Sequence, residues 1–275
     1  MASQIYFMEE ISLMITRIAT LGLAFFMAFG LMFIGQSDGG LVGAWLFDEG
    51  SGDVAKGIVG SDGMLMNGAG WTDGVRGSAI SFHDPDSQHV LFNADEDPAG
   101  AFILHGDSDA TLVLWVRSVE PLRHGSWVWT RGDDADAGRF NIHNGDGTVF
   151  SFDYREDDGT HHPTDWGVFN VTLTIGEWTH VALTRVGNEY TLYGNGEQTA
   201  TWVDENPLLP TANGWILGSP RGCCPLNGDV DELGFFDIAL TQDQINLAMG
   251  GVEALGAVES SGKLATTWAD IKGRD

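Results

Sequence analysis

The chain has 275 residues, 39 of them acidic and 13 basic, which gives a formal net charge of −26. Nucleic acids and anionic lipid surfaces are bound mainly through Lys and Arg, so this balance argues against both classes of partner. A hydrophobic content of 43% is enough for a sizeable core, and 38 glycines indicate a turn-rich, β-rich chain.

An uncharged and almost wholly apolar run spans residues 18–34 and follows Arg17. A basic flank, an apolar stretch and small polar residues afterwards are typical of a secretory signal peptide. The run also approaches the length of about 20 residues that a membrane-spanning helix needs, so an uncleaved anchor is the competing interpretation. We therefore assign residues 1–40 to a hydrophobic helix outside the fold, and expect the rest to be secreted or anchored outside the cytoplasm.

Short strand patterns follow, separated by turn residues. They are predicted at 41–47, 64–66, 88–92, 111–118, 126–131, 139–143, 148–155 and 168–174, with polar loops at 133–136, 144–147 and 157–166. Along 111–118, Leu112, Leu114 and Val116 share one face because side chains alternate along a strand. Many short strands at near-regular spacing indicate an antiparallel sandwich or barrel.

The clearest local signals lie between residues 176 and 249. Strands are predicted at 178–185, 189–193, 198–203, 215–218 and 229–236. Asn195-Gly196 predicts a type I′ hairpin turn, which needs positive φ at both central positions. Thr241 and Gln244 form a capping box that begins a helix at 241–249, and Gly250-Gly251 ends it. Residues 250–275 are expected to be a C-terminal tail.

Three motifs in this order resemble one known family. The segments W-T-H-V-A-L-T-R (178–185) and Y-T-L-Y-G-N-G (190–196) resemble the core of LamG-like jelly-roll domains in the concanavalin A-like lectin/glucanase superfamily. Residues 41–52 resemble the opening strand of that family, 71–82 a hairpin, and 228–245 the closing strand and helix. The resemblance implies an all-β, antiparallel two-sheet jelly-roll sandwich over residues 41–249. It does not fix the function, because this fold hosts lectins, glycosidases and interaction modules.

The resemblance also implies a structural Ca²⁺ ion where the first and last strands meet, near Asp48 and Asp231. Calcium takes about six to eight oxygen ligands, which two carboxylates, backbone carbonyls and water can supply. The alternative interpretation is that Asp48 only begins a turn and that Asp231 accepts hydrogen bonds from loop amides.

The nearest match to the E-x-D-x-x-E strand of laminarinase-type glycosidases is the segment 229–233, D-V-D-E-L. Asp229 and Asp231 share a face, but Glu232 follows Asp231 directly and is expected on the opposite face. Retaining glycoside hydrolysis needs two carboxyl groups about 5–5.5 Å apart on one sugar. We therefore expect no catalytic residues, and a divergent glycosidase is the least favoured function.

Aromatic and histidine side chains between residues 127 and 166 are candidates for stacking on sugar rings. For most of those in strands, the core of a sandwich is the favoured interpretation. The ligand-binding candidates are Tyr154, His161, His162 and Trp166. A zinc site here is disfavoured, because adjacent histidines rarely chelate one ion.

Cys223 and Cys224 are the only two cysteines. Outside the cytoplasm they can form a vicinal disulfide, and two free thiols are the alternative. Taken together, these features predict an exported, non-catalytic module that binds glycans at or outside the cell surface. A protein-interaction or structural module of the cell envelope is the rival hypothesis.

Overall fold

The computed structural model describes twelve segments of the chain: residues 40–83, 87–92, 109–120, 122–123, 126–130, 139–144, 146–147, 149–155, 161–162, 171–203, 215–218 and 226–255. They all belong to one compact unit that begins at Gly39. Among these residues, no helix is both long and apolar enough to cross a bilayer. The apolar run at 18–34 and the tail beyond residue 255 lie outside the described residues.

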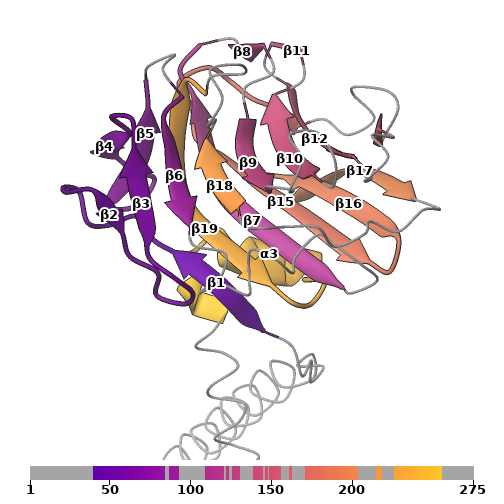
Figure 1. The fold of residues 1–275 in the computed structure, drawn as a ribbon. Helices are drawn as coiled ribbons and strands as arrows, with labels where there is room; N and C mark the ends of the chain where they lie inside the picture. Colours follow the sequence, from indigo (N-terminus) through magenta and orange to yellow (C-terminus); the bar gives the residue numbers. More distant parts are fainter. Residues whose placement is uncertain are drawn as a thin grey trace, which may run out of the picture. The chain divides into compact units, whose positions relative to one another are not determined.

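The first of two large sheets has eight antiparallel strands, and β19 lies near its middle (Figure 1). Its order is β17 (Glu197–Val203), β16 (Glu189–Gly194), β15 (Thr179–Val186), β7 (Ala110–Ser118), β19 (Gly228–Phe236), β5 (Ser78–Phe82) and β4 (Gly70–Asp73). β1 (Leu41–Trp45) pairs with the second half of β19, whereas β5 pairs with its first residues. Two strands therefore share one edge of β19.

The second sheet has nine strands and is also antiparallel. Its order is β13 (His161–His162), β12 (Val149–Arg155), β10 (Arg139–Asn144), β9 (Ser126–Thr130), β18 (Trp215–Gly218), β6 (His89–Phe92), β3 (Gly63–Met66) and β2 (Val54–Ala55), with β14 (Val171–Thr172) paired to β12. The short strands β8 (Leu122–Arg123) and β11 (Asp146–Gly147) pair separately. The predicted antiparallel two-sheet sandwich is confirmed.

The main core lies between the sheets and is rich in aromatic rings. Trp45 is fully buried, and its ring makes edge contacts with Phe92 at 4.9 Å and with Trp215 at 5.0 Å between centroids. Leu112, Leu114 and Val116 of β7 face this core, as their alternation predicts. Edge-to-face ring pairs add to the free energy gained by burial alone.

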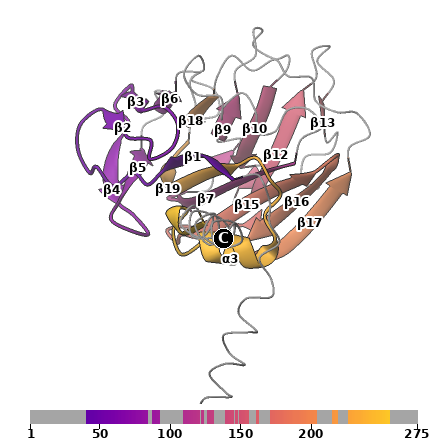
Figure 2. The ribbon, with the colours of Figure 1, turned by 90° about the horizontal axis from the view of Figure 1, so that it is seen from below.

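The opposite face of the eight-stranded sheet, here called the outer face, carries helix α3 (Gln242–Ala248), which Figure 2 shows beneath β7 and β15. Ile245 and Ala248 of α3 pack with Val113, Ala182 and Phe236 in a second apolar cluster. The helix begins at the predicted capping box. Gln244 N donates to Thr241 Oγ1 at 3.3 Å, and Thr241 N donates to Gln244 Oε1 at 2.9 Å.

We expect Thr241→Ala to lower the free energy of unfolding by about 1 kcal/mol, because the first helical turn loses the acceptor of its cap. Thr241→Ser keeps the hydroxyl and should stay close to the wild type. Urea denaturation of the three proteins measures the difference. An alanine variant as stable as the serine variant would contradict a role for this cap.

The structure also corrects several predicted boundaries. Asn195 (φ 49°) and Gly196 (φ 80°) confirm the type I′ turn. The polar loops predicted at 157–166 and 144–147 are wrong in part, because β13 and β11 form short pairings inside them. Of the strand predicted at 168–174, the structure describes residues 171–174, and within these Val171–Thr172 pair with β12. These short strands pair over two residues, which is too few for an alternating pattern to be visible.

Candidate functional site

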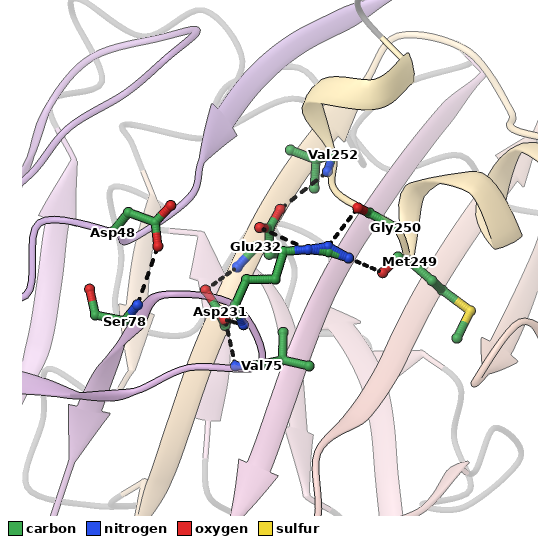
Figure 3. Close-up of polar contacts among 9 residues, drawn as sticks. Asp48, Val75, Ser78, Asp231, Glu232, Met249, Gly250 and Val252 are labelled. Atoms are coloured by element: carbon green, nitrogen blue, oxygen red, sulfur yellow. Dashed lines mark hydrogen bonds and ion pairs between the residues drawn. The ribbon is translucent and has the colours of Figure 1, made fainter.

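Of the two acidic residues predicted where the first and last strands meet, Asp231 lies on β19, between the residues that pair with β5 and those that pair with β1 (Figure 3). Glu232 follows it directly. The register between β7 and β19 shifts between Asp231 and Gly234, and Glu232 has φ of 50°. An extra residue of this kind makes a β-bulge, which re-aims the side chains around it.

The bulge places Asp231 and Glu232 on the same side of the sheet. Val230 and Leu233, which flank them, both belong to the core between the sheets. Asp231 Oδ2 accepts a hydrogen bond from the Arg76 amide, and Glu232 Oε1 lies 3.8 Å from Arg76 Nε. The expectation that Glu232 faces away from Asp231 is therefore wrong, and its left-handed backbone is the reason.

Three backbone amides hold the Asp231 carboxylate. Its Oδ2 accepts from Val75 N at 2.8 Å and from Arg76 N at 3.1 Å, while Oδ1 accepts from Glu232 N at 2.9 Å. Asp48 lies in the turn after β1, and its Oδ1 accepts from Ser78 N at 3.2 Å. A turn at Asp48 and bonds from loop amides to Asp231 are the contacts that the alternative interpretation predicts, and they do not test the calcium ion.

Arg76 joins this cluster to the end of α3. Its guanidinium donates to the carbonyl oxygens of Met249, at 2.7 Å, and Gly250. Glu232 Oε2 accepts from Val252 N at 3.2 Å, just beyond those carbonyls. Sequence reasoning did not single out Arg76, because its role depends on a loop of β4–β5 meeting a helix about 170 positions later.

Burial dominates the electrostatics of the two acids. The pKa of Asp231 is raised from 3.8 to about 7, first by burial and then by the Glu232 charge, against the opposing effect of the amide hydrogen bonds. Burial also raises the pKa of Glu232, again opposed by its bonds to Val252 and the nearby Arg76. Both carboxyl groups are thus easier to protonate than exposed ones.

We expect the stability of the domain to fall as pH rises from about 4 to about 7. Between the unfolded and folded pKa of Asp231 the native state holds a proton that the unfolded state has lost, so folding is favoured at the acidic end. The full effect is on the order of 4 kcal/mol. Asp231→Asn should flatten this slope, and exposed Asp243→Asn should not. Denaturation of the wild type and both variants at several pH values tests this prediction. Equal slopes of stability against pH in the two variants would contradict it.

Calcium does not fit the oxygens of this cluster well. Among the described residues, no group of three or more His, Cys, Asp or Glu side chains surrounds a common point. Asp231 already accepts three N–H bonds, and the cation beside Glu232 is Arg76. A calcium ion near Asp48 and Asp231 remains a prediction.

Asp229, the other acidic residue on this face of β19, is also held by basic side chains. Its Oδ2 accepts from Arg117 Nε at 2.7 Å, and its Oδ1 lies 3.1 Å from His83 Nε2. The guanidinium of Arg117 lies 4.6 Å from the centre of the Trp178 ring. Both carboxyl groups are therefore held in place, Asp229 by two basic side chains and Asp231 by three backbone amides.

A family model described as concanavalin A-like lectin/glucanases superfamily (Laminin_G_3) matches residues 84–246. The chain belongs to this superfamily. The fold and the predicted resemblance are both confirmed by this match. No curated protein matches the sequence significantly.

Three solved structures share this fold at a sequence identity of 17% or less. Domain 4 of AbnA, a GH43 extracellular arabinanase from Geobacillus stearothermophilus, in complex with arabinotriose, is 17% identical with a TM-score of 0.58, and the match covers 76% of this chain and 98% of that one. A structure of botulinum neurotoxin type C, whose cell entry is dependent upon interaction with two ganglioside molecules, is 11% identical with a TM-score of 0.56, and the match covers 77% of this chain and 51% of that one. A Trypanosoma rangeli sialidase mutant displaying trans-sialidase activity is 15% identical with a TM-score of 0.55, and the match covers 80% of this chain and 33% of that one. The chain thus spans about half of the neurotoxin structure and about a third of the sialidase.

The register of the nine-stranded sheet brings part of the predicted ligand site together. Tyr154 is the cross-strand partner of His162, and Arg155 that of His161. Trp127 is fully buried, which confirms the core interpretation for that residue. Trp166, Cys223 and Cys224 lie outside the described residues, so the loop site and the vicinal disulfide remain predictions.

Proposed function

We propose that this superfamily member is an exported, non-catalytic module that binds glycans. The observation that carries the non-catalytic part is the state of Asp229 and Asp231, whose carboxylates are engaged by Arg117 and by three backbone amides. A glycosidase pair must instead present two carboxyl groups to one sugar. The superfamily covers lectins and glucanases, so its membership supports carbohydrate as the ligand class.

The solved relatives support the same ligand class. The arabinanase domain carries arabinotriose, and its match covers nearly all of that domain, which makes it a comparison of whole domains. Export is supported by the apolar run at 18–34 after Arg17, and by a net charge that suits an extracellular, salt-rich environment. The predicted candidates Tyr154, His161, His162 and Trp166 give the proposal one location to test.

The test is a glycan-array screen of the full-length chain, run once with calcium and once with a chelator. We expect binding to a defined class of glycan, with no release of free sugar from soluble oligosaccharides. Binding lost in chelator would make Asp48 and Asp231 the first residues to change. A folded sample that binds no glycan in either arm would overturn the proposal and favour a protein partner.

A further inference from the structure

The outer face of the eight-stranded sheet continues beyond the part that α3 covers. Two register rows cross it there: Asp231, Trp115 and His180 are successive cross-strand partners on β19, β7 and β15, and Asp229 pairs with Arg117 in the next row. Trp178 precedes β15 and lies against Arg117. We call Trp115, Arg117, Trp178, His180 and Asp229 the outer-face patch; Figure 1 shows its three strands side by side.

Hydrogen-bonding atoms in the outer-face patch lack partners. Trp115 Nε1 and His180 Nδ1 are both buried and make no hydrogen bond within the described part of the chain, whereas Asp229 Oδ1 lies 3.1 Å from His83 Nε2. The whole of His180 is only 1% exposed. A buried polar atom without a partner costs free energy, so two of them side by side on one face of a sheet need an explanation.

The unpartnered atoms differ in kind. The indole nitrogen of Trp115 can only donate. Burial lowers the pKa of His180 to about 3, so its ring is neutral and Nδ1 donates or accepts according to the tautomer. Hydroxyl groups both donate and accept, and a ligand rich in hydroxyl groups can satisfy both atoms.

Aromatic rings lie beside these atoms. The Trp115 ring meets that of His180 edge-on, with 5.2 Å between centroids, and both Trp115 and Trp178 are partly exposed. Arg117 covers Trp178 from one side at 4.6 Å. Flat apolar rings next to fixed polar atoms are the arrangement that orients a small polar ligand with an apolar face, such as a pyranose or furanose.

The charges around the patch favour an uncharged ligand. The two arginines nearest the patch are both paired: Arg117 with Asp229, and Arg76 with Glu232. Arg117 also donates to the backbone oxygen of Asp73, and Asp231 adds an acidic neighbour. With a net charge of −26 for the chain, an anionic sugar would meet repulsion without a free cation among the described neighbours of the patch.

We propose that the outer-face patch is the sugar-contacting surface of this domain and that it binds an uncharged, hydroxyl-rich saccharide. The inference rests on the proposed glycan-binding function and gives it a location distinct from the predicted site at Tyr154, His161, His162 and Trp166. Trp115 Nε1 and His180 Nδ1 contact sugar hydroxyls, and the ring of Trp115 or Trp178 packs on the sugar.

The test uses the full-length chain and two sets of probes: neutral oligosaccharides, with arabinotriose among them, and matched oligosaccharides that carry uronic acids. Trp115→Phe keeps the ring and removes only the Nε1 donor, while Trp178→Ala removes a ring. Trp71→Phe is the matched control, because the Trp71 indole donates to the carbonyl oxygen of Gly52, away from the patch. Trp166→Ala tests the loop site. Near-ultraviolet circular dichroism confirms that each variant is folded.

We expect neutral probes to bind the wild type and to shift the indole N–H resonance that disappears in Trp115→Phe. Affinity should fall about tenfold in Trp178→Ala and at least threefold in Trp115→Phe, with Trp71→Phe and Trp166→Ala unchanged. Binding that persists in both patch variants overturns the patch and leaves the glycan function standing. Tighter binding of the uronic-acid probes overturns the neutral class. If the folded wild type binds no probe in either set, the proposed function and this inference are both wrong.

Discussion

Gly74→Ala is expected to lower the free energy of unfolding by about 3 kcal/mol, at the upper end of the usual cost of overpacking. A Cβ atom at this position would lie 2.3 Å from the Arg76 carbonyl oxygen and 2.5 Å from that of Ser78. It would also lie 2.5 Å from Asp231 Oδ2. The first two contacts are with backbone atoms of a tight loop, so the loop must move, and it then withdraws the amides that hold Asp231.

Gly70→Ala is the matched control, because no atom lies within 4 Å of a Cβ built there. Its effect should stay within about 0.5 kcal/mol, as for most exposed substitutions. Denaturant unfolding of both variants gives the comparison. If the two alanines cost the same, the close approach of the 74–77 loop to Asp231 is not a constraint on the fold.

Arg76→Met is expected to cost about 2–3 kcal/mol, somewhat below the range for breaking a fully buried ion pair because Arg76 is partly exposed. The substitution leaves the Glu232 side chain, which is 3% exposed, without its cation. It also removes both donors to the carbonyl oxygens that follow α3. Methionine keeps most of the aliphatic packing, so the lost free energy of unfolding is that of the guanidinium contacts.

A double-mutant cycle with Glu232→Gln separates these contributions. Glutamine can still accept from Val252 N, and it carries no charge that needs Arg76. Arg76→Met should therefore cost at least about 1 kcal/mol less in the Glu232→Gln background, which is the size of coupling expected for residues in contact. Strict additivity would show that Arg76 acts on α3 alone and not on the acid.

The sandwich itself was predictable because its strands alternate. Leu112, Leu114 and Val116 fall on the core side and Val113 under α3, as the period of two requires. The helix was predictable because a capping box is a local signal that needs no tertiary contact. Each of these features depends on residues close together in the sequence.

The site was only partly predictable. The position of Asp231 near the meeting of first and last strands came from the family resemblance, but the bulge at Glu232 comes from a register shift between β7 and β19. No residue type at this position signals that shift, since glutamate has no preference for positive φ. The strand pattern alone therefore assigned Glu232 to the wrong face.

The outer-face patch was hidden for a related reason. Trp178 and His180 are two positions apart in one predicted strand, and Trp115 and Arg117 are two positions apart in another, so alternation puts each pair on one face. Their proximity follows only from the pairing of His180 with Trp115. Alternation specifies which side of a sheet a residue faces, whereas the register that sets its neighbours depends on the assembled sheet.

The pairing of β1 with β19 also bears on how the domain is made. The Gly40 amide donates to the carboxylate of Asp237, 197 positions later, and β1 forms its ladder along the same stretch of β19. Contacts between such distant segments close large loops and slow folding. A chain emerging from the ribosome cannot complete its central sheet until β19 has been synthesised, and β1 has no partner on β19 until then. For a protein proposed to leave the cytoplasm this is an advantage, because a domain that cannot finish folding early stays competent for translocation.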